Sequence, residues 1–373
     1  MTETIDTLLT PALLLDEARL DRNLARMRAK IASLGVGFRP HIKTVKSAAV
    51  LDRLFEGGRG PITVSTLAEA QAAAGLGFRD ILYAAALTPN KLPVARALRA
   101  DGVDLKVITD SVDGARAIAA AGEAIPTLIE IDCDGARAGI PPEDRATLVA
   151  VAGTLGDGFA GVMTHCGASY GARSEAEIVA WAERERAAVV DAAETLRAAG
   201  FASRIVSLGS TPTVLFSPGM AGVTEARAGV FTFFDLVMAG IGVCAVDDIA
   251  ISVLASVNGV QKARGRYLVD AGWMAMSRDR GTASQPVDQG YGLVCDREGR
   301  PYPDLILAEA NQEHGVLALR PGSRAALPEL AVGDLVRILP NHACATAAQH
   351  SAYRVVRPGD DRIHAHWPRF GGW

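Results

Sequence analysis

The chain has 373 residues, of which 49% are hydrophobic and 21% charged, and its net charge of −4 without a basic stripe argues against nucleic acid as a partner. Five scattered cysteines without CxxC spacing argue against a disulfide framework. The acidic N-terminus lacks the apolar stretch of a signal peptide, and no uncharged apolar run reaches the roughly 18 residues of a membrane helix, so we expect a cytoplasmic protein that does not contact a membrane.

Short apolar segments alternate with Ala-, Glu- and Arg-rich helical segments between about residues 36 and 230. A strand at 10–16 and a helix at about 17–34 precede them. The alternating strands are expected at 37–43, 61–66, 80–85, 103–109, 126–132, 159–165, 205–211 and 222–229. Strands that alternate with helices form parallel βαβ units, and eight such units predict a (β/α)8 barrel of the TIM type. An open doubly wound sheet is the competitor, but no GxGxxG follows the first strand.

After residue 245 the sequence changes to short strands joined by turn-rich connections. These strands are expected at 249–257, 266–270, 305–308, 315–319, 335–339 and 352–356. We therefore predict an α/β protein in which residues 15–245 form the barrel. Residues 1–14 and 246–373 are expected to form a second, mainly β domain.

Lys43 is the most informative residue of the first strand segment. The chain has only six lysines, and this one ends an apolar strand segment and precedes an amphipathic helix. A lysine in that position would point into a site, where desolvation removes its proton and lets it form a Schiff base with an aldehyde. An ordinary surface lysine is the alternative.

Other residues able to do chemistry follow the later strands, at the end of a barrel where active sites form. Arg137 lies in the loop after the fifth strand, and His165 and Tyr170 follow the sixth. Each is a weak signal alone, because a single histidine is more often structural than catalytic. Together, at the same end of successive strands, they indicate a site.

The loop after the seventh strand contains Gly209, Ser210 and Thr211. Glycine lets backbone N–H groups approach an anion closely, and the hydroxyls add donors, so this loop is a candidate phosphate site. A strand-to-helix turn with a capping hydroxyl explains the loop equally well. A lysine and a phosphate loop on one face of a barrel suit pyridoxal 5′-phosphate (PLP), which stabilises carbanions at Cα.

His342 and Cys344 form a second constellation in the predicted β domain. They are two positions apart, so on an extended segment their side chains would face the same way. Imidazole and thiolate suit Zn2+, and two protein ligands leave positions open for water and substrate. His364 and His366 share the spacing, and we interpret that pair as structural or solvent-facing.

Together these motifs resemble the D-serine dehydratase and D-threonine aldolase family of fold-type III PLP enzymes. The resemblance runs nearly end to end, and the lysine motif combined with the late H-x-C is specific to the group. The matching segments are TPALLLD at 10–16, RPHIKT at 39–44, the segment 132–139, THCG at 164–167, GSTPT at 209–213, DAG at 270–272, EHG at 313–315 and PNHAC at 340–344.

The resemblance implies an alanine racemase-like barrel followed by a β domain. It implies that Lys43 binds PLP, that the loop 209–213 holds the phosphate, and that His342 and Cys344 hold a divalent metal. It also implies a homodimer in which the β domain of one subunit completes the site of the other. The further residues expected to contact PLP are His41, Arg137, His165 and Tyr170.

Two positions depart from the family pattern, and one feature separates its activities. Val45 replaces a histidine of the lysine motif, and Phe231 stands where tyrosine is common, so roles of these positions in orienting the cofactor are in doubt. Cys344 resembles the zinc-dependent dehydratases, whereas the aldolases more often carry H-x-D, which suits Mn2+ or Mg2+. We therefore expect Zn2+, with Mn2+ or Mg2+ as alternatives.

The expected activity is dehydration of a small D-amino acid with a 3-hydroxyl group, namely D-serine, D-threonine or D-threo-3-hydroxyaspartate, to a 2-keto acid and ammonia. Lys43 would remove the Cα proton, and the metal would make hydroxide a tolerable leaving group. A D-threonine aldolase is the alternative, with His165 or a metal-bound water as the base. An amino acid racemase, which needs no metal, and a non-enzymatic PLP carrier, which tends to be a barrel alone, are less favoured.

Overall fold

The computed structural model describes residues 3–373, which form two compact units. The β unit comprises the described residues up to Ala25 together with Ser47–Val50 and Val230–Arg369. The barrel unit comprises Arg26–Lys46, Leu51–Gly229 and Phe370–Trp373. The expected domain bounds at 15–245 rest on composition and stay a prediction.

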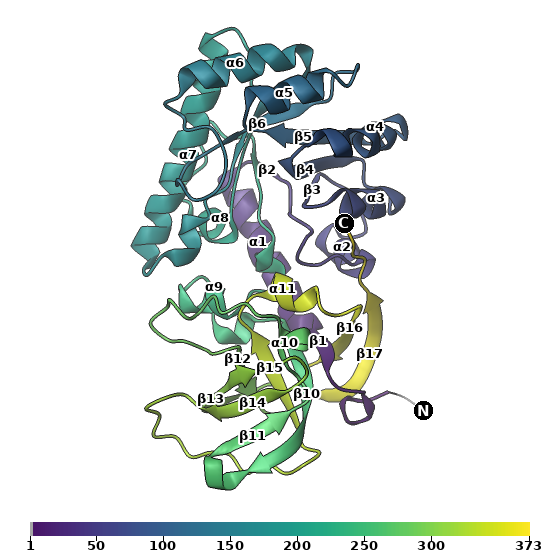
Figure 1. Cartoon of the computed structure of the whole chain (residues 1–373), viewed down its shortest axis with the longest axis vertical. Coiled ribbons are helices and arrows are strands. Elements are labelled where there is room, and N and C mark those ends of the chain that lie inside the picture. The colour runs from purple at the N-terminus through teal and green to yellow at the C-terminus, as the bar shows by residue number, and fades with distance from the viewer. Residues whose placement is uncertain (1–2) are drawn as a thin grey trace. The chain divides into compact units, whose positions relative to one another are not determined.

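Eight parallel strands form the sheet of the barrel unit (Figure 1). The order β2-β9-β8-β7-β6-β5-β4-β3 is closed by a bridge between His41 and Thr63, which joins the two ends of the sheet. Each strand overlaps a predicted segment, and the predicted barrel is confirmed. The strands are β2 (Gly37–Phe38), β3 (Ile62–Val64), β4 (Asp80–Ala86), β5 (Asp104–Thr109), β6 (Thr127–Ile131), β7 (Phe159–Thr164), β8 (Ile205–Leu208) and β9 (Glu225–Ala226).

Helices alternate with these strands, as the sequence pattern predicts. Ser111 and Ser174 cap helices α5 and α7 by accepting hydrogen bonds from the backbone N–H groups three residues later, which satisfies donors that the first turn leaves unpaired. The helix expected at 17–34 is α1 (Glu17–Leu34). The others are α2 (Ala48–Leu54), α3 (Leu67–Gly75), α4 (Leu92–Ala100), α5 (Val112–Ala119), α6 (Arg145–Leu155), α7 (Glu175–Ala198) and α8 (Thr211–Phe216).

A buried ion-pair network ties the strands of the barrel together. Arg39, which is 3% exposed, binds Asp80 at 2.6 Å through Nη1 and Glu225 at 2.8 Å through Nε. Lys106 joins Asp80 at 2.7 Å. Because Asp80 and Glu225 lie on β4 and β9, the arginine after β2 connects strands on both sides of the closure.

A nine-stranded sheet forms most of the β unit, in the order β11-β14-β13-β12-β15-β10-β1-β16-β17. β1 pairs antiparallel with β10 and parallel with β16, so the N-terminal strand lies within this sheet. The strands are β1 (Ala12–Asp16), β10 (Ile251–Gln261), β11 (Arg266–Val269), β12 (Gly292–Cys295), β13 (Pro301–Ala310), β14 (Gly315–Leu319), β15 (Leu335–Pro340), β16 (Ala352–Arg357) and β17 (Asp360–Pro368).

Three short helices complete the β unit: α9 (Leu236–Gly240), α10 (Trp273–Met276) and α11 (Ala343–Ala347). Strands β12 and β17 were not predicted; β17 is a polar strand without a buried face. Among the helices of residues 3–373, none is both long enough and apolar enough to cross a membrane.

Candidate functional site

Lys43 lies in a tight turn after β2. The backbone N–H groups of Val45 and Lys46 both donate to the Ile42 carbonyl, at 3.1 and 3.0 Å. This turn buries Ile42 and leaves the Lys43 side chain exposed to solvent. The shielding expected for a lysine after a strand is therefore not provided within the described chain, and the amine is accessible to a ligand.

Two histidines with depressed pKa values lie within electrostatic reach of Lys43. His165 Nδ1 donates to the Gly209 carbonyl at 2.9 Å, which leaves Nε2 without a proton when the ring is neutral. Desolvation, with smaller contributions from the charges of Lys43 and Arg227, lowers the pKa of His165 to about 4, against the opposing effect of the hydrogen bond to Gly209. Desolvation also lowers the pKa of His41 well below its ordinary value, again with Lys43 contributing. Both imidazoles are therefore neutral at neutral pH.

Tyr170 and Arg137 lie on the loops that follow β7 and β6. Tyr170 belongs to a single 3-10 turn (Ala168–Gly171), and its ring centroid lies 6.1 Å from that of His165. Arg137 is exposed, and its Nη2 lies 3.9 Å from Oε1 of Glu130. Burial raises the pKa of Glu130. The structure thus brings the ring of Tyr170 close to that of His165, while the side chain of Arg137 is exposed to solvent.

The loop after β8 contains the capping turn, which is one of the two interpretations considered for it. Gly209 has a φ of +142°, and a Cβ there would collide with the Arg227 carbonyl oxygen, so glycine is required. Ser210 caps α8: its Oγ accepts from Thr213 N at 3.3 Å, and Ser210 N donates to Thr213 Oγ1 at 3.1 Å. α8 begins at Thr211. The capping turn is present, and α8 therefore begins shortly after the end of β8.

Two buried charged residues near this loop were missed by the sequence analysis. Arg227 directly follows β9, is 4% exposed, and donates to Ser207 Oγ and the Thr164 carbonyl, both at 2.6 Å. Burial lowers its pKa. The strand-end rule used for His165 could have found Arg227. Glu185 lies on α7, with its pKa raised to about 7 by burial, and carries no such signal.

The candidate metal pair in the β unit does not lie on an extended segment. The extended geometry assumed for His342 and Cys344 is therefore wrong. His342 is extended after β15, but Cys344 is the second residue of α11. The run of small residues favours the helix, and Asp235 Oδ2 anchors it by accepting from Ala343 N at 3.0 Å. The two side chains nevertheless meet, because the Cys344 thiol hydrogen-bonds with His342.

Acidic groups surround His342. Burial opposes its charged form, but hydrogen bonds to Asp279 and Cys344 raise the pKa of His342 to about 11. Nδ1 lies 2.7 Å from Asp279 Oδ2, so the carboxylate fixes the ring and leaves Nε2 as the ligand atom. Burial raises the pKa of Asp235 to about 6. This negative environment, with imidazole and sulfur donors, fits a divalent cation.

Asn341 fixes the loop that carries Asp279. Its Nδ2 donates to the Asp279 carbonyl at 3.1 Å and to the Gly290 carbonyl at 2.7 Å, and its Oδ1 accepts from Thr282. No motif of the sequence assigns a role to Asp279. Its partner His342 lies 63 residues later, so no local pattern joins them.

Family models match both parts of the chain. The alanine racemase N-terminal domain matches residues 15–237, and the serine dehydratase domain matches residues 250–356. The chain belongs to the serine dehydratase family with an alanine racemase-like barrel. Among family members, the D-threo-3-hydroxyaspartate dehydratase of Delftia sp. (strain HT23) is 50% identical and is matched over 100% of both chains. The D-serine dehydratase of Dictyostelium discoideum is 30% identical over 98% of each.

The solved structures of the Delftia dehydratase share the fold closely. The enzyme superposes with a TM-score of 0.95 at 50% identity over 100% of both chains. A histidine-to-alanine variant gives a TM-score of 0.95, and a cysteine-to-alanine variant in the metal-free form gives 0.94. In that enzyme the replaced histidine and cysteine are two positions apart, the spacing of His342 and Cys344.

Proposed function

We propose that this chain is a PLP- and zinc-dependent dehydratase of D-3-hydroxyamino acids, with D-threo-3-hydroxyaspartate as its preferred substrate. The products would be a 2-keto acid and ammonia. The observation that carries the proposal is the hydrogen-bonded pair of His342 and Cys344, in a chain 50% identical end to end to a dehydratase of that substrate. The cysteine distinguishes this pair from the H-x-D pair expected of aldolases.

The residues at the strand ends of the barrel unit suit PLP. Lys43 offers an accessible amine for its aldehyde, and the loop Gly209–Thr211 at the start of α8 is the site that we propose for its phosphate. When bound, PLP supplies an electron sink for a carbanion at Cα. The residues proposed to position its ring are His41, Arg137, His165 and Tyr170.

We assign proton transfer at Cα to Lys43. Its exposed side chain has the reach and the freedom to take that proton, and as an amine it can return one. His165 suits a positioning role, because a histidine with a pKa of about 4 is a weak base at neutral pH. This weakens the aldolase alternative in the form that uses His165 to deprotonate the β-hydroxyl.

We assign the metal to His342 and Cys344, with Asp279 orienting the histidine. A bound Zn2+ would act there as a Lewis acid toward the β-hydroxyl of the substrate. The cysteine favours zinc over the harder Mn2+ and Mg2+. A homodimer, which the family resemblance implies, and a cytoplasmic location are part of the same proposal.

Product analysis tests the proposal. The purified protein, supplied with PLP and Zn2+, is given D-threo-3-hydroxyaspartate and, separately, D-threonine. We expect oxaloacetate and ammonia from the first, and 2-oxobutyrate and ammonia from the second. Glycine with glyoxylate or acetaldehyde would instead make the chain an aldolase. That outcome has a specific basis, since a D-threonine aldolase of Arthrobacter sp. is 30% identical over 94% of this chain and 89% of its own.

A further inference from the structure

Two of the five cysteines lie together in the barrel unit, on the loops after two neighbouring strands. Cys133 follows β6 and Cys166 follows β7, and their sulfur atoms lie within 4.8 Å of one another. The pairing of Ile131 with Thr164 places the two cysteines opposite each other, each two residues further along its chain. Neighbouring strands lie about 4.8 Å apart at such a pair, which is close to the separation of about 4.4–6.8 Å that a disulfide requires between Cα atoms, and each cysteine is two residues beyond the last pair of the two strands.

We propose that Cys133 and Cys166 form an oxidisable dithiol, which peroxides convert to a disulfide and thiol reductants restore. In the first step a peroxide oxygen is transferred to Cys133, giving a sulfenic acid and, from hydrogen peroxide, water. The Cys166 sulfur then attacks the Cys133 sulfur, and the hydroxyl leaves with the thiol proton as a second water. The two thiols lose two electrons and the peroxide gains them.

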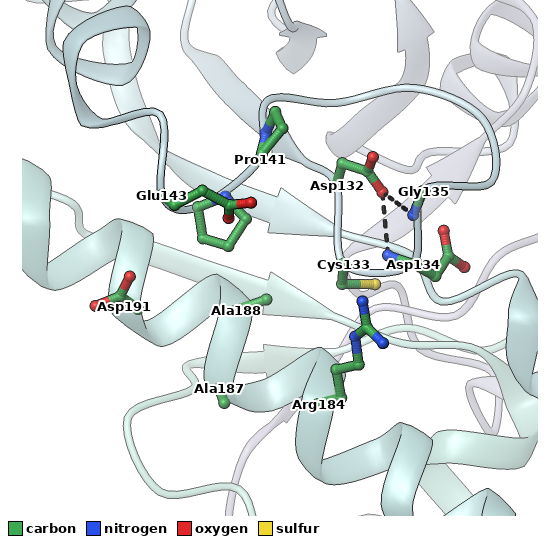
Figure 2. A pocket seen from close by; sticks show the side chains of 11 residues that line it. Asp132, Cys133, Asp134, Gly135, Pro141, Glu143, Arg184, Ala187, Ala188 and Asp191 are labelled. Atoms are coloured by element: carbon green, nitrogen blue, oxygen red, sulfur yellow. Dashed lines mark hydrogen bonds between the residues drawn. The ribbon is translucent and has the colours of Figure 1, made fainter.

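The surroundings give the two cysteines different parts in this reaction. Cys133 lines a surface pocket of about 500 Å3 between the β6 loop and α7 (Figure 2), and with 4% of its surface exposed it is the cysteine of the pair that an oxidant in this pocket would meet first. Cys166 is completely buried. A hydrogen bond with Cys133 and burial both raise the pKa of the Cys166 thiol, so Cys166 is protonated in the reduced pair and the first oxidation is assigned to Cys133.

The same surroundings disfavour a metal ion at this place, although Asp134 lies within 4.8 Å of both sulfurs. Both carboxylate oxygens of Asp134 already accept backbone hydrogen bonds, from Ala136 N at 3.0 Å and Ala168 N at 2.8 Å. Arg184 extends from α7 toward Cys133 (Figure 2), and its positive charge opposes a second cation. Asp134 therefore serves to hold the two loops together.

Formation of the disulfide would disturb the proposed cofactor loop, because hydrogen bonds connect Cys166 to Ser210 of that loop through Ser169. A disulfide brings the sulfurs to about 2.05 Å, so Cys166 must move toward Cys133. Its backbone N–H donates to Glu185 at 2.7 Å, and its carbonyl accepts from Ser169 Oγ at 2.8 Å. Ser169 Oγ in turn lies 2.9 Å from Ser210 Oγ. We infer a rise in the PLP dissociation constant of about threefold to tenfold, the effect of losing one hydrogen bond; this second part rests on the proposed function.

Peptide mapping of the zinc-loaded holoenzyme tests the dithiol directly. The enzyme is treated with hydrogen peroxide, alkylated and digested without reduction; trypsin cleaves at Arg137 and so separates the two cysteines. We expect a Cys133–Cys166 crosslink and the loss of two alkylatable thiols relative to the untreated enzyme, both reversed by dithiothreitol. Cys166→Ala should stop at a sulfenic acid on Cys133 that dimedone labels. Cys244→Ala is the matched control and should still form the crosslink.

Other results would overturn the inference. Alkylation of both cysteines after peroxide treatment would show that they do not pair. Protection of both by added Zn2+ in the Cys344→Ala variant would make the cluster a metal site instead. A crosslink with an unchanged PLP dissociation constant would remove the link to the cofactor loop. Detection of the crosslink requires neither turnover nor bound PLP. An active dehydratase that forms no crosslink would contradict the dithiol alone. A protein that forms the crosslink but binds no PLP would contradict the proposed function alone.

Discussion

The barrel unit and the β unit place their candidate functional side chains in different ways. In the barrel unit, His165, Gly209 and Arg227 each follow a strand of one parallel sheet, so their order along the chain already brings them to one end. In the β unit, His342 follows β15, but the carboxylate of Asp279 that fixes it comes from an irregular loop 63 residues earlier. The first arrangement is produced by a repeated βα unit, and the second by side-chain hydrogen bonds between distant segments.

This difference predicts how each site responds to substitution. Loss of a reacting group in the barrel unit should remove its chemistry and leave the frame intact, because the strands position each residue independently. Loss of a supporting carboxylate in the β unit should lower the affinity for the metal, because the carboxylate fixes the geometry of the histidine ligand. The substitutions below test the two halves of this comparison.

Lys43→Ala should give the largest effect. If Lys43 transfers the Cα proton, turnover should fall by about a thousandfold or more, near the upper end of what general acid–base catalysis contributes. The visible absorbance of lysine-bound PLP should disappear. Lys91→Ala removes an amine of the same unit that donates a hydrogen bond to Tyr83 OH, and this variant should keep both the turnover and the absorbance. Retained absorbance in Lys43→Ala would remove this lysine from the mechanism.

Cys344→Ala should separate the metal from the cofactor. The absorbance of bound PLP should persist, while bound zinc is lost and turnover falls by at least about a hundredfold, because Lewis acid activation is worth several kcal/mol. Zinc content by atomic spectroscopy and turnover are measured together. Cys244→Ala, at a half-buried cysteine in the same unit, is the control. Full activity in the presence of a chelator would contradict the metal role.

Asp279→Ala should weaken zinc binding without removing a ligand. Substitution of a carboxylate that orients a metal-binding histidine costs about 10–100-fold in affinity. Asp279→Asn retains an acceptor for His342 Nδ1 and should lose less. Zinc affinity is measured by competition with a chromophoric chelator. Asp304→Ala removes an exposed carboxylate of the β unit that pairs with Arg320 and serves as the control. Equal affinities in all four proteins would show that Asp279 does not orient the ligand.

The same contrast explains what the sequence could predict. Strand–helix alternation located β2 to β9 and the residues that follow them, because each βα unit is a local pattern. The H-x-C spacing located His342 and Cys344, although the extended geometry assumed for them was wrong. Asp279, Asp235 and Glu185 act through contacts with residues far away in the chain, and nothing in their neighbourhoods marks those contacts. The exposure of Lys43 depends on a turn at Ile42, which the strand pattern does not specify.

The smallest expected effect concerns the stability of the barrel unit at acidic pH. The pKa of His165 is lowered from 6.5 to about 4, so between these values the unfolded chain binds a proton that the native chain does not. The free energy of unfolding should therefore fall as pH decreases through this window, by on the order of 1–3 kcal/mol for this group. His165→Asn should reduce the loss of stability between pH 7 and pH 5, measured by urea unfolding without PLP so that cofactor binding does not contribute. Tyr170→Phe alters the neighbouring ring without a group that titrates in this range and should keep the full pH dependence. An unchanged slope in His165→Asn would mean that the native barrel unit does not depress the pKa of this histidine, and the argument that His165 is too weak a base for proton transfer would then be wrong.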